Sequence, residues 1–157
     1  MLLTPHTMTG LAIGATVSNP IIGFPLSIVM HFVGDLVPHW DFYSGTVNEE
    51  RRVGWRPLAV MADMALGVAA GVAVTLYALW VRGEPTVAFN IFICGVGGVL
   101  PDALEGPHIY FHTEPKLLKL ISGTQNKLQF QAPLPWGILT QGLVVIASLL
   151  IISNSLL

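Results

Sequence analysis

Residues 30–41 read MHFVGDLVPHWD, an apolar stretch that carries two histidines and two aspartates. His31 and Asp35 are four residues apart, so in a helix both side chains lie on one face. A proline follows where such a helix should end, and His39 and Asp41 come directly after it. Ionisable groups at membrane depth are costly, and each needs a partner, a cavity or a metal ion. The stretch therefore predicts a membrane helix whose end carries a functional site.

The composition of the chain is that of a membrane protein. Of its 157 residues, 53% are hydrophobic and only 10% are charged, and the mean hydropathy is +0.68. Soluble domains contain about 25% charged residues. Residues 1–6 include no Lys or Arg, so we expect no cleavable signal peptide. We predict an all-α, polytopic integral membrane protein that forms a single membrane domain over residues 1–157.

Five apolar segments can be read along the chain, and they predict about five transmembrane helices. They cover residues 7–17, 24–37, 58–81, 86–100 and 134–152. A full span needs about 20 residues, so the first, second and fourth segments either extend into neighbouring polar motifs or cross a locally thinned region. We divide the domain into two helical hairpins (1–104), an interfacial segment (105–133) and a C-terminal membrane helix (134–157).

The first four helices resemble a duplicated hairpin. A shift of 57 residues places His6 on Asp63, and a shift of 63 places His39 on Asp102. Glycine and alanine matches in apolar helices also arise by chance, so duplication and coincidence both remain open. In an up-down-up-down bundle these four residues would share one side of the membrane.

The distribution of basic residues predicts which side that is. Six of the seven Lys and Arg residues follow the second or the fourth helix, and Arg82 alone falls on the other side. The positive-inside rule then places the polar side in the cytoplasm. We expect a multi-pass protein of the inner membrane, with its N-terminus and site cytoplasmic and its C-terminus outside.

Histidines and carboxylates gather near the predicted helix ends, and we take them as candidate metal ligands. The candidates are His6, His31, Asp35, His39, Asp41, Asp102, His108 and His112. Imidazole with carboxylate suits zinc, with manganese or iron as alternatives, and the absence of thiolates argues against a structural zinc site. The set exceeds what one tetrahedral ion uses, so one ion with supporting carboxylates or two ions are both open. A lone membrane histidine can equally be a hydrogen-bonded packing residue.

Two further groups have candidate roles in catalysis. Asp63 and Glu105 are candidate general bases that would take a proton from an attacking water. Arg51, Arg52 and Arg56 could receive a phosphate through their guanidinium groups. The alternative for these arginines is a solvated loop that follows the positive-inside rule.

The stretch at residues 30–41, together with Val-Leu-Pro-Asp at 99–102, resembles the membrane-bound metal-dependent hydrolases of bacteria and archaea, the YdjM-type family. On that pattern His6, Asp35, residues 38–41 and Pro101-Asp102 correspond to family motif positions. The chain departs from it at His39, which stands where a Leu-Pro-Asp aspartate is expected. The His-x-x-x-Asp spacing is also similar to that of zinc-dependent phospholipases C and P1-type nucleases, which implies a phosphoester substrate.

These observations predict a metal-dependent hydrolase that cleaves a phosphoester of a lipid or lipid-linked substrate. Residues 115–130 read as an amphipathic segment at the membrane surface, with lysines near anionic headgroups. One rival function is a metal-ion or proton transporter that uses the same cluster. A second is a non-catalytic membrane protein with a structural metal. Nucleotide-binding, serine-hydrolase and nucleic-acid-binding motifs are absent from the sequence, so we expect no nucleic-acid partner.

Overall fold

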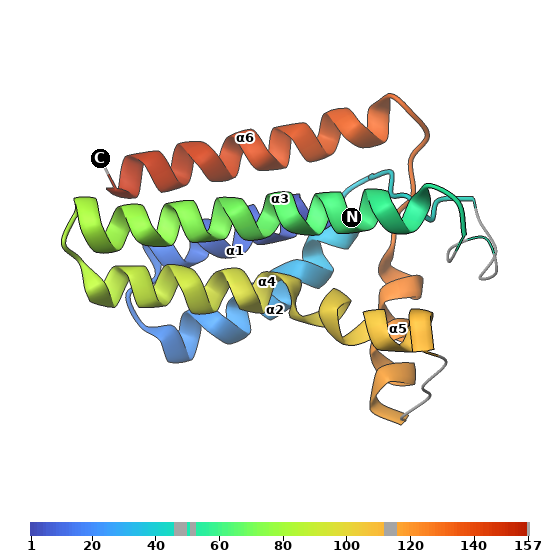
Figure 1. Ribbon diagram of the computed structural model, residues 1–157, viewed down its shortest axis with the longest axis horizontal. Helices are drawn as coiled ribbons and strands as arrows, with labels where there is room; N and C mark the ends of the chain where they lie inside the picture. The colour runs from blue at the N-terminus through green and yellow to red at the C-terminus, as the bar shows by residue number, and fades with distance from the viewer. Residues whose placement is uncertain (46–49, 51–52, 112–115, 157) are drawn as a thin grey trace.

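The computed structural model describes residues 1–45, 50, 53–111 and 116–156, and gives no side-chain placement for 107–111 and 117–119. The described residues form six helices, and their only β-pairing is an isolated bridge between His39 and Gln131. The predicted all-α class is thus confirmed for the described residues. In chain order the helices are α1 (Leu3–Thr16), α2 (Pro20–Asp35), α3 (Arg56–Leu76) with its π-helical continuation η2 (Tyr77–Val81), α4 (Pro85–Phe111), α5 (Lys116–Leu128) and α6 (Trp136–Leu156) (Figure 1).

Three of the helices are long and apolar enough to cross a membrane, fewer than the five we expected. They cover Arg56–Val81, Pro85–Gly106 and Trp136–Leu156. Helix α2 is apolar but has only 16 residues, and α1 has 14. At 1.5 Å per residue, α1 is about 21 Å long, which is shorter than a hydrocarbon core of about 30 Å. Apolarity alone therefore overestimated the number of spans.

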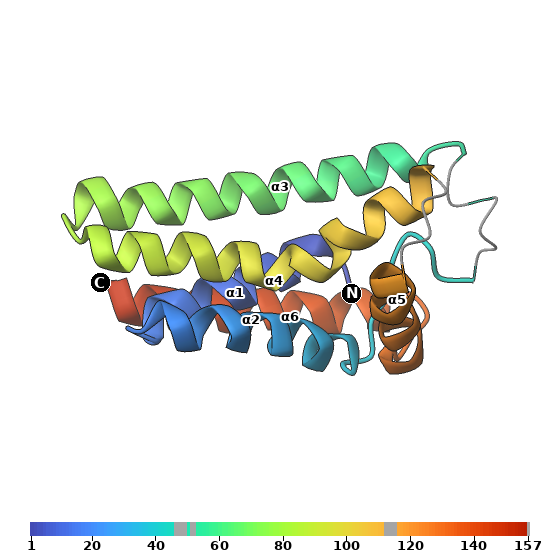
Figure 2. The ribbon, with the colours of Figure 1, turned by 90° about the horizontal axis from the view of Figure 1, so that it is seen from below.

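Helix α1 is short because it is an internal helix of the bundle. It contacts α2, α3, α4 and α6, and Figure 2 shows it enclosed by its neighbours. Gly10 and Gly14 permit this close packing: a Cβ at Gly14 would lie 2.5 Å from Cα of Ile91, and one at Gly10 would collide with the Cys94 carbonyl oxygen. Small residues allow two backbones to approach in this way. The apolar residues of α1 thus build the protein core instead of facing lipid.

The start of α2 is fixed by a cap that lies earlier than we expected. The Asn19 side chain accepts a hydrogen bond from the backbone N–H of Ile21 at 2.9 Å, and Pro20 occupies the first helical position, which favours proline. The helix therefore begins at Pro20, and Pro25 lies inside it. Our expectation of a start near residue 24 was wrong.

Helices α3 and α4 form a hairpin, and α4 is longer than we expected. Gly83 turns the chain with a φ of +69°, a conformation that glycine adopts without steric cost. The exposed side chains of Arg82 and Glu84 pair across this turn at 3.6 Å. Helix α4 then continues to Phe111, so Asp102 lies inside this helix and not at its end. The predicted end near residue 100 was therefore too early.

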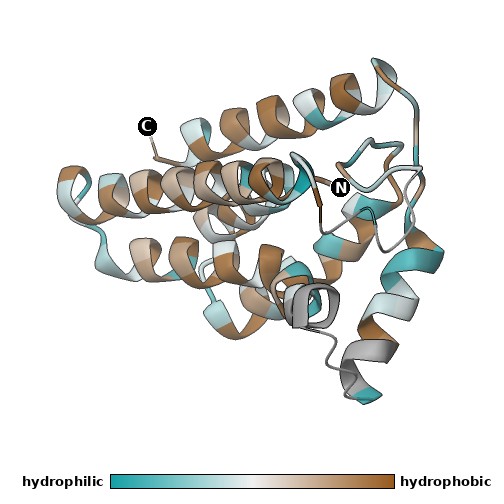
Figure 3. Cartoon of the chain, turned by 45° about the vertical axis from the view of Figure 1, so that its right-hand side comes forward, coloured by the Kyte–Doolittle hydropathy of each residue, from teal (hydrophilic) through white to brown (hydrophobic). Residues whose placement is uncertain are grey.

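The five helices α1, α2, α3, α4 and α6 alternate in direction, so one end of the bundle collects the starts of three and the ends of two. Helix α5 crosses that end (Figures 1 and 2). Figure 3 shows hydrophilic segments gathered there, whereas the flanks of the bundle are largely hydrophobic. Large apolar side chains on the flanks are exposed, for example Leu66 (60%), Val68 (59%) and Leu143 (66%). So much exposed apolar surface is the mark of a protein that meets a lipid phase.

Candidate metal centre

Three helices supply four ionisable side chains at the polar end of the bundle. Helix α1 supplies His6, α2 supplies His31 and Asp35 in its last turns, and α4 supplies Asp102. We call these four residues the His/Asp cluster. The backbones of α1 and α4 meet at the cluster, because a Cβ at Gly98 would lie 2.5 Å from the His6 carbonyl oxygen. The two histidines and Asp35 are almost fully buried, each with about 1% exposure.

Three members of the cluster could hold a metal ion. His6, His31 and Asp102 each offer one ligand atom, and these atoms all lie within 4.8 Å of one another. The His31 Nε2 atom lies 3.5 Å from Asp102 Oδ1. Two ligands of a tetrahedral zinc ion, each bound at about 2.0–2.1 Å, lie roughly 3.4 Å apart. The His6 and His31 rings stack with centroids 3.8 Å apart. The donors, which lie within 4.8 Å of one another, would move closer together to bind one ion.

Hydrogen bonding fixes the tautomer of His31. Its Nδ1 atom lies 2.8 Å from the Gly98 carbonyl oxygen, which can only accept a hydrogen bond. Nδ1 therefore carries the proton, and the lone pair is on Nε2, which faces Asp102. A backbone carbonyl behind the far nitrogen is a recurrent support for a metal-ligating histidine.

Within the cluster, Asp35 accepts hydrogen bonds that hold His6 and the N-terminus in place. Its Oδ1 atom accepts a hydrogen bond from His6 Nε2 at 3.2 Å and one from the Met1 amino group at 2.5 Å. The proton on His6 Nε2 leaves the lone pair on Nδ1, which is buried without a hydrogen-bond partner among the described residues. Asp35 Oδ2 is also unpartnered there and lies 3.7 Å from His31 Nε2. Buried polar atoms are normally satisfied, so these free atoms fit a cation.

Gln125 of α5 reaches the same space, and the sequence analysis missed it. Its amide nitrogen donates to His31 Nε2 at 3.1 Å and to Asp102 Oδ1 at 2.6 Å. Its Oε1 atom is buried without a partner among the described residues. A neutral amide on an amphipathic segment matches no ligand motif. The one sequence feature that points to Gln125 is its position three residues after Ser122, on the same face of α5. Both side chains are buried.

His39 lies apart from the three-ligand group, in the loop after α2. Its Nδ1 atom donates to the Val37 carbonyl oxygen at 2.8 Å, and its buried Nε2 atom has no hydrogen-bond partner among the described residues. The backbone of His39 pairs with the segment after α5, through Phe130 and Ala132. Burial lowers the pKa of His39 from its ordinary value, which favours the neutral ring.

Asp41 shapes the same loop. Its Oδ1 atom accepts hydrogen bonds from the Tyr43 backbone at 2.6 Å and from the Ser44 hydroxyl at 3.3 Å, an arrangement that aspartate often makes in turns. Asp41 Oδ2 lies 3.9 Å from His39 Nε2. The structure therefore places His39 and Asp41 together as a pair, next to the cluster in the chain and outside the group of three.

Asp63, one of the two candidate bases, caps helix α1 from the neighbouring helix α3. Its Oδ2 atom accepts the Leu3 N–H at 2.6 Å, and its Oδ1 atom accepts the Thr4 N–H at 3.2 Å and the Thr4 hydroxyl at 2.6 Å. Carboxylates at a helix N-terminus satisfy free N–H groups and favour the helix dipole. The geometry gives Asp63 a structural task.

Glu105, the other candidate base, lines a small cavity beside the cluster. This acidic cavity has a volume of about 120 Å³, and four carboxylates line it: Asp41, Asp63, Asp102 and Glu105. Glu105 is half-buried. Because Asp102 belongs both to the cavity and to the three-ligand group, the cavity adjoins the candidate metal position.

The structure places Arg56, but not the other predicted phosphate-binding arginines. Arg56 Nε donates to the Phe42 carbonyl oxygen at 3.1 Å, and the guanidinium lies 5.5 Å from the centre of the Trp55 ring. It therefore braces the loop after α2. Arg51, Arg52 and His112 lie outside the described residues. His108 lies in α4, at a position where side chains are not described.

Together the fold and the site define an all-helical protein with three helices able to span a membrane and a buried histidine–aspartate group able to hold a metal ion. No family model, no curated protein and no solved structure matches the chain. The functional conclusions below therefore rest on the residues and their geometry.

Proposed function

We propose that this protein is a metal-dependent hydrolase of the inner membrane that cleaves a phosphoester of a lipid or lipid-linked substrate. The observation that carries the proposal is the group of His6, His31 and Asp102, whose ligand atoms lie within 4.8 Å of one another beside a cavity rich in carboxylates. Catalytic zinc sites use three protein ligands and keep a fourth position open, whereas structural sites are closed by four. Two imidazoles and one carboxylate form a ligand set that is used for catalytic zinc and also for non-haem iron; zinc is the metal we propose, with iron as the alternative.

In this mechanism the residues around the candidate metal position have separate roles. When bound, a divalent ion supplies positive charge that acidifies water and polarises a phosphoryl oxygen. Asp35 and the Gly98 carbonyl hold the two histidines in their ligating tautomers. Glu105 accepts a proton from the water whose oxygen attacks phosphorus. The new P–O bond replaces the P–O bond to the departing alcohol, and that alcohol takes up a proton from Glu105 as it leaves.

Glu105 suits the role of base better than Asp63 does. Both oxygens of Asp63 already accept hydrogen bonds from the first turn of α1. A general base must have a lone pair within reach of the attacking water. Glu105 lines the acidic cavity three residues after Asp102 on α4, and therefore lies one helical turn from a proposed metal ligand.

The rest of the bundle favours hydrolysis over ion transport. Away from the polar end, the buried polar side chains of the described helices are neutral, and two of their atoms, Thr75 Oγ1 and Asn90 Oδ1, have no hydrogen-bond partner among the described residues. Ser27 donates to the Gly23 carbonyl oxygen at 2.9 Å, and Asn90 donates to the Ser18 carbonyl oxygen at 2.7 Å. A transit path needs ionisable or hydrated groups that continue across the bilayer, and the described spans offer no such series.

A metal-replacement assay with matched variants tests the proposal. The full chain in lipid nanodiscs is stripped with a chelator, reloaded with zinc, manganese or iron, and supplied with phospholipid and lipid-linked phosphoesters. We expect product release only after reloading, and a fall of about 10²- to 10⁴-fold in kcat for Glu105→Gln, the range typical of a lost general base. Glu84→Gln, at the opposite end of the bundle, is the control and should retain full activity. Bound metal without turnover of any phosphoester would contradict the proposal.

A further inference from the structure

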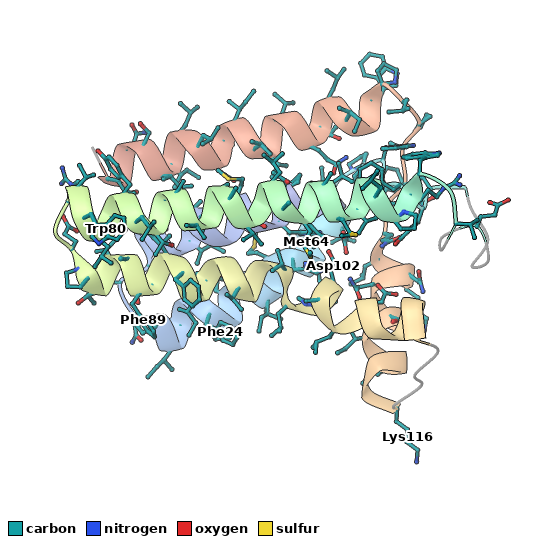
Figure 4. All side chains as sticks on the ribbon, in the orientation of Figure 1. Phe24, Met64, Trp80, Phe89, Asp102 and Lys116 are labelled. Atoms are coloured by element: carbon teal, nitrogen blue, oxygen red, sulfur yellow. The ribbon has the colours of Figure 1, made fainter. Side chains whose placement is uncertain are left out.

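A long apolar groove runs between α3 and α4 and leads to the cluster. Its volume is about 620 Å³, and its walls include Met61, Met64 and Val68 of α3 and Phe92 and Val99 of α4. Figure 4 shows Met64 and Asp102 beside each other between the two helices. Asp102 is the only charged residue that lines this groove among the described residues.

Glycines keep the groove open above α1. Gly67 and Gly95 line it, and a Cβ on either would lie 2.8 Å from a side chain of α1, the Thr7 hydroxyl or the Leu11 Cδ2 atom respectively. Helix α1 therefore forms the floor of the groove and already packs closely against both glycines. Gly71 differs: a Cβ there would meet its nearest atoms only at 3.9 and 4.0 Å. A Cβ at Gly71 would thus make ordinary contacts with the Thr7 and Leu11 side chains, and a larger side chain at this lining position would take up volume of the groove next to α1.

The groove is continuous with the acidic cavity at the polar end. Leu3, Val60, Asp102 and Gly106 line both spaces. Along α3 the groove extends from Pro57 to Thr75, which is about 27 Å at 1.5 Å per residue. Half of a hydrocarbon core is about 15 Å thick. The groove is therefore long enough to follow a lipid chain through a whole leaflet, with its polar end at the cluster.

We propose that the α3–α4 groove binds one hydrocarbon chain of the substrate lipid and thereby places the phosphoester head beside the three-ligand group. The proposal rests on the proposed function and adds the substrate class: a lipid that carries a long hydrocarbon chain, in place of a water-soluble phosphoester. Apolar contact along the groove would supply binding energy, and the single carboxylate at its end marks where the chain stops and the polar head begins.

Photolabelling tests the groove without any need for turnover. A phospholipid with a diazirine midway along its acyl chain is incorporated into phosphatidylcholine nanodiscs with the full chain, irradiated, and the adducts are located by mass spectrometry. We expect adducts concentrated in residues 61–72 and 92–99. Gly71→Leu and Val68→Phe should each remove most of them, whereas Gly142→Leu should not, because nothing lies within 4 Å of a Cβ at Gly142. Two groove variants are used so that poor folding of one does not decide the result.

A kinetic comparison links the groove to the reaction. For Gly71→Leu and Val68→Phe we expect kcat/KM on a long-chain phosphoester to fall about tenfold or more, since one methylene in an apolar pocket already changes it about 10- to 200-fold. The fall should be smaller on a water-soluble short-chain phosphoester, and the control Gly142→Leu, outside the groove, should leave kcat/KM on the long-chain phosphoester unchanged. Adducts spread evenly over all lipid-facing helices, or cross-links from α3 to a second copy, would overturn the groove proposal. If neither phosphoester is turned over, the proposed function fails, and the labelling pattern alone decides the groove.

Discussion

His31 carries its lone pair on Nε2, the proposed ligand atom, because the hydrogen on Nδ1 is donated to the Gly98 carbonyl oxygen at 2.8 Å; the Gln125 amide donates to this Nε2 at 3.1 Å. His6 is held in the same manner by the Asp35 carboxylate. Each buried imidazole thus donates through one nitrogen and has a lone pair on the other: His6 Nδ1 has no hydrogen-bond partner among the described residues, and His31 Nε2 accepts from Gln125. Residues that fix a ligand's tautomer are as much a part of a metal site as the ligand itself.

Asp63 gives a prediction that separates a structural from a catalytic carboxylate. Asp63→Ala removes the acceptors for two backbone N–H groups of α1 and should lower the free energy of unfolding by about 0.5–2 kcal/mol, the usual range for a lost helix cap. Thermal unfolding in nanodiscs measures this change. The turnover rate of the folded, metal-loaded variant should stay within severalfold of the wild type. Unchanged stability with a rate loss of about 10²-fold or more would instead identify Asp63 as the base.

At the scale of the helices, hydropathy identified the apolar helices. It did not show which of them can span a membrane and which are enclosed by other helices. The apolar segments at 58–81 and 134–152 match α3 with η2 and α6 closely, because a long apolar run has few alternatives. The first segment was taken as a span, but α1 is enclosed by four other helices. Burial against protein and burial against lipid demand the same apolar residues, so sequence alone does not separate them.

The site was only partly predictable for a related reason. His6, His31, Asp35 and Asp102 could be proposed because ionisable residues stand out in an apolar chain. Gln125 could not, since its role depends on how α5 folds back across the end of the bundle. The ligand roles predicted for His39 and Asp41 stay predictions: the structure leaves this pair outside the group of three, although Asp41 lines the same cavity as Asp102.

The close packing of α1 on α4 gives a prediction at the level of the elements. Gly10→Ala introduces a Cβ that would collide with the Cys94 carbonyl oxygen, and overpacking of this kind typically costs about 1–3 kcal/mol. We expect lower thermal stability and weaker metal binding, because a shift of α1 moves His6. Gly142→Ala is the matched control: its site on α6 is open, so the helix should keep or gain about 0.5–1 kcal/mol. Equal stability of the two variants would show that α1 and α4 pack less closely than described.

At the scale of the whole molecule, the site exists only because separate elements meet at one end of the bundle. The three proposed ligands come from α1, α2 and α4, and α5 closes the space above them through Gln125. The flanks are apolar and the hairpin turn at the other end carries the exposed Arg82–Glu84 pair. The positive-inside rule predicts that this end of the bundle faces the cytoplasm.

The most direct test of this account is the metal content of the purified full chain by elemental analysis. We predict stoichiometric zinc in the wild type and in Glu84→Gln. The metal should be lost from His6→Ala, His31→Ala and Asp102→Asn, while circular dichroism shows that the helices are retained. A wild-type protein without bound metal, or three ligand variants that keep all of it, would contradict the central claim.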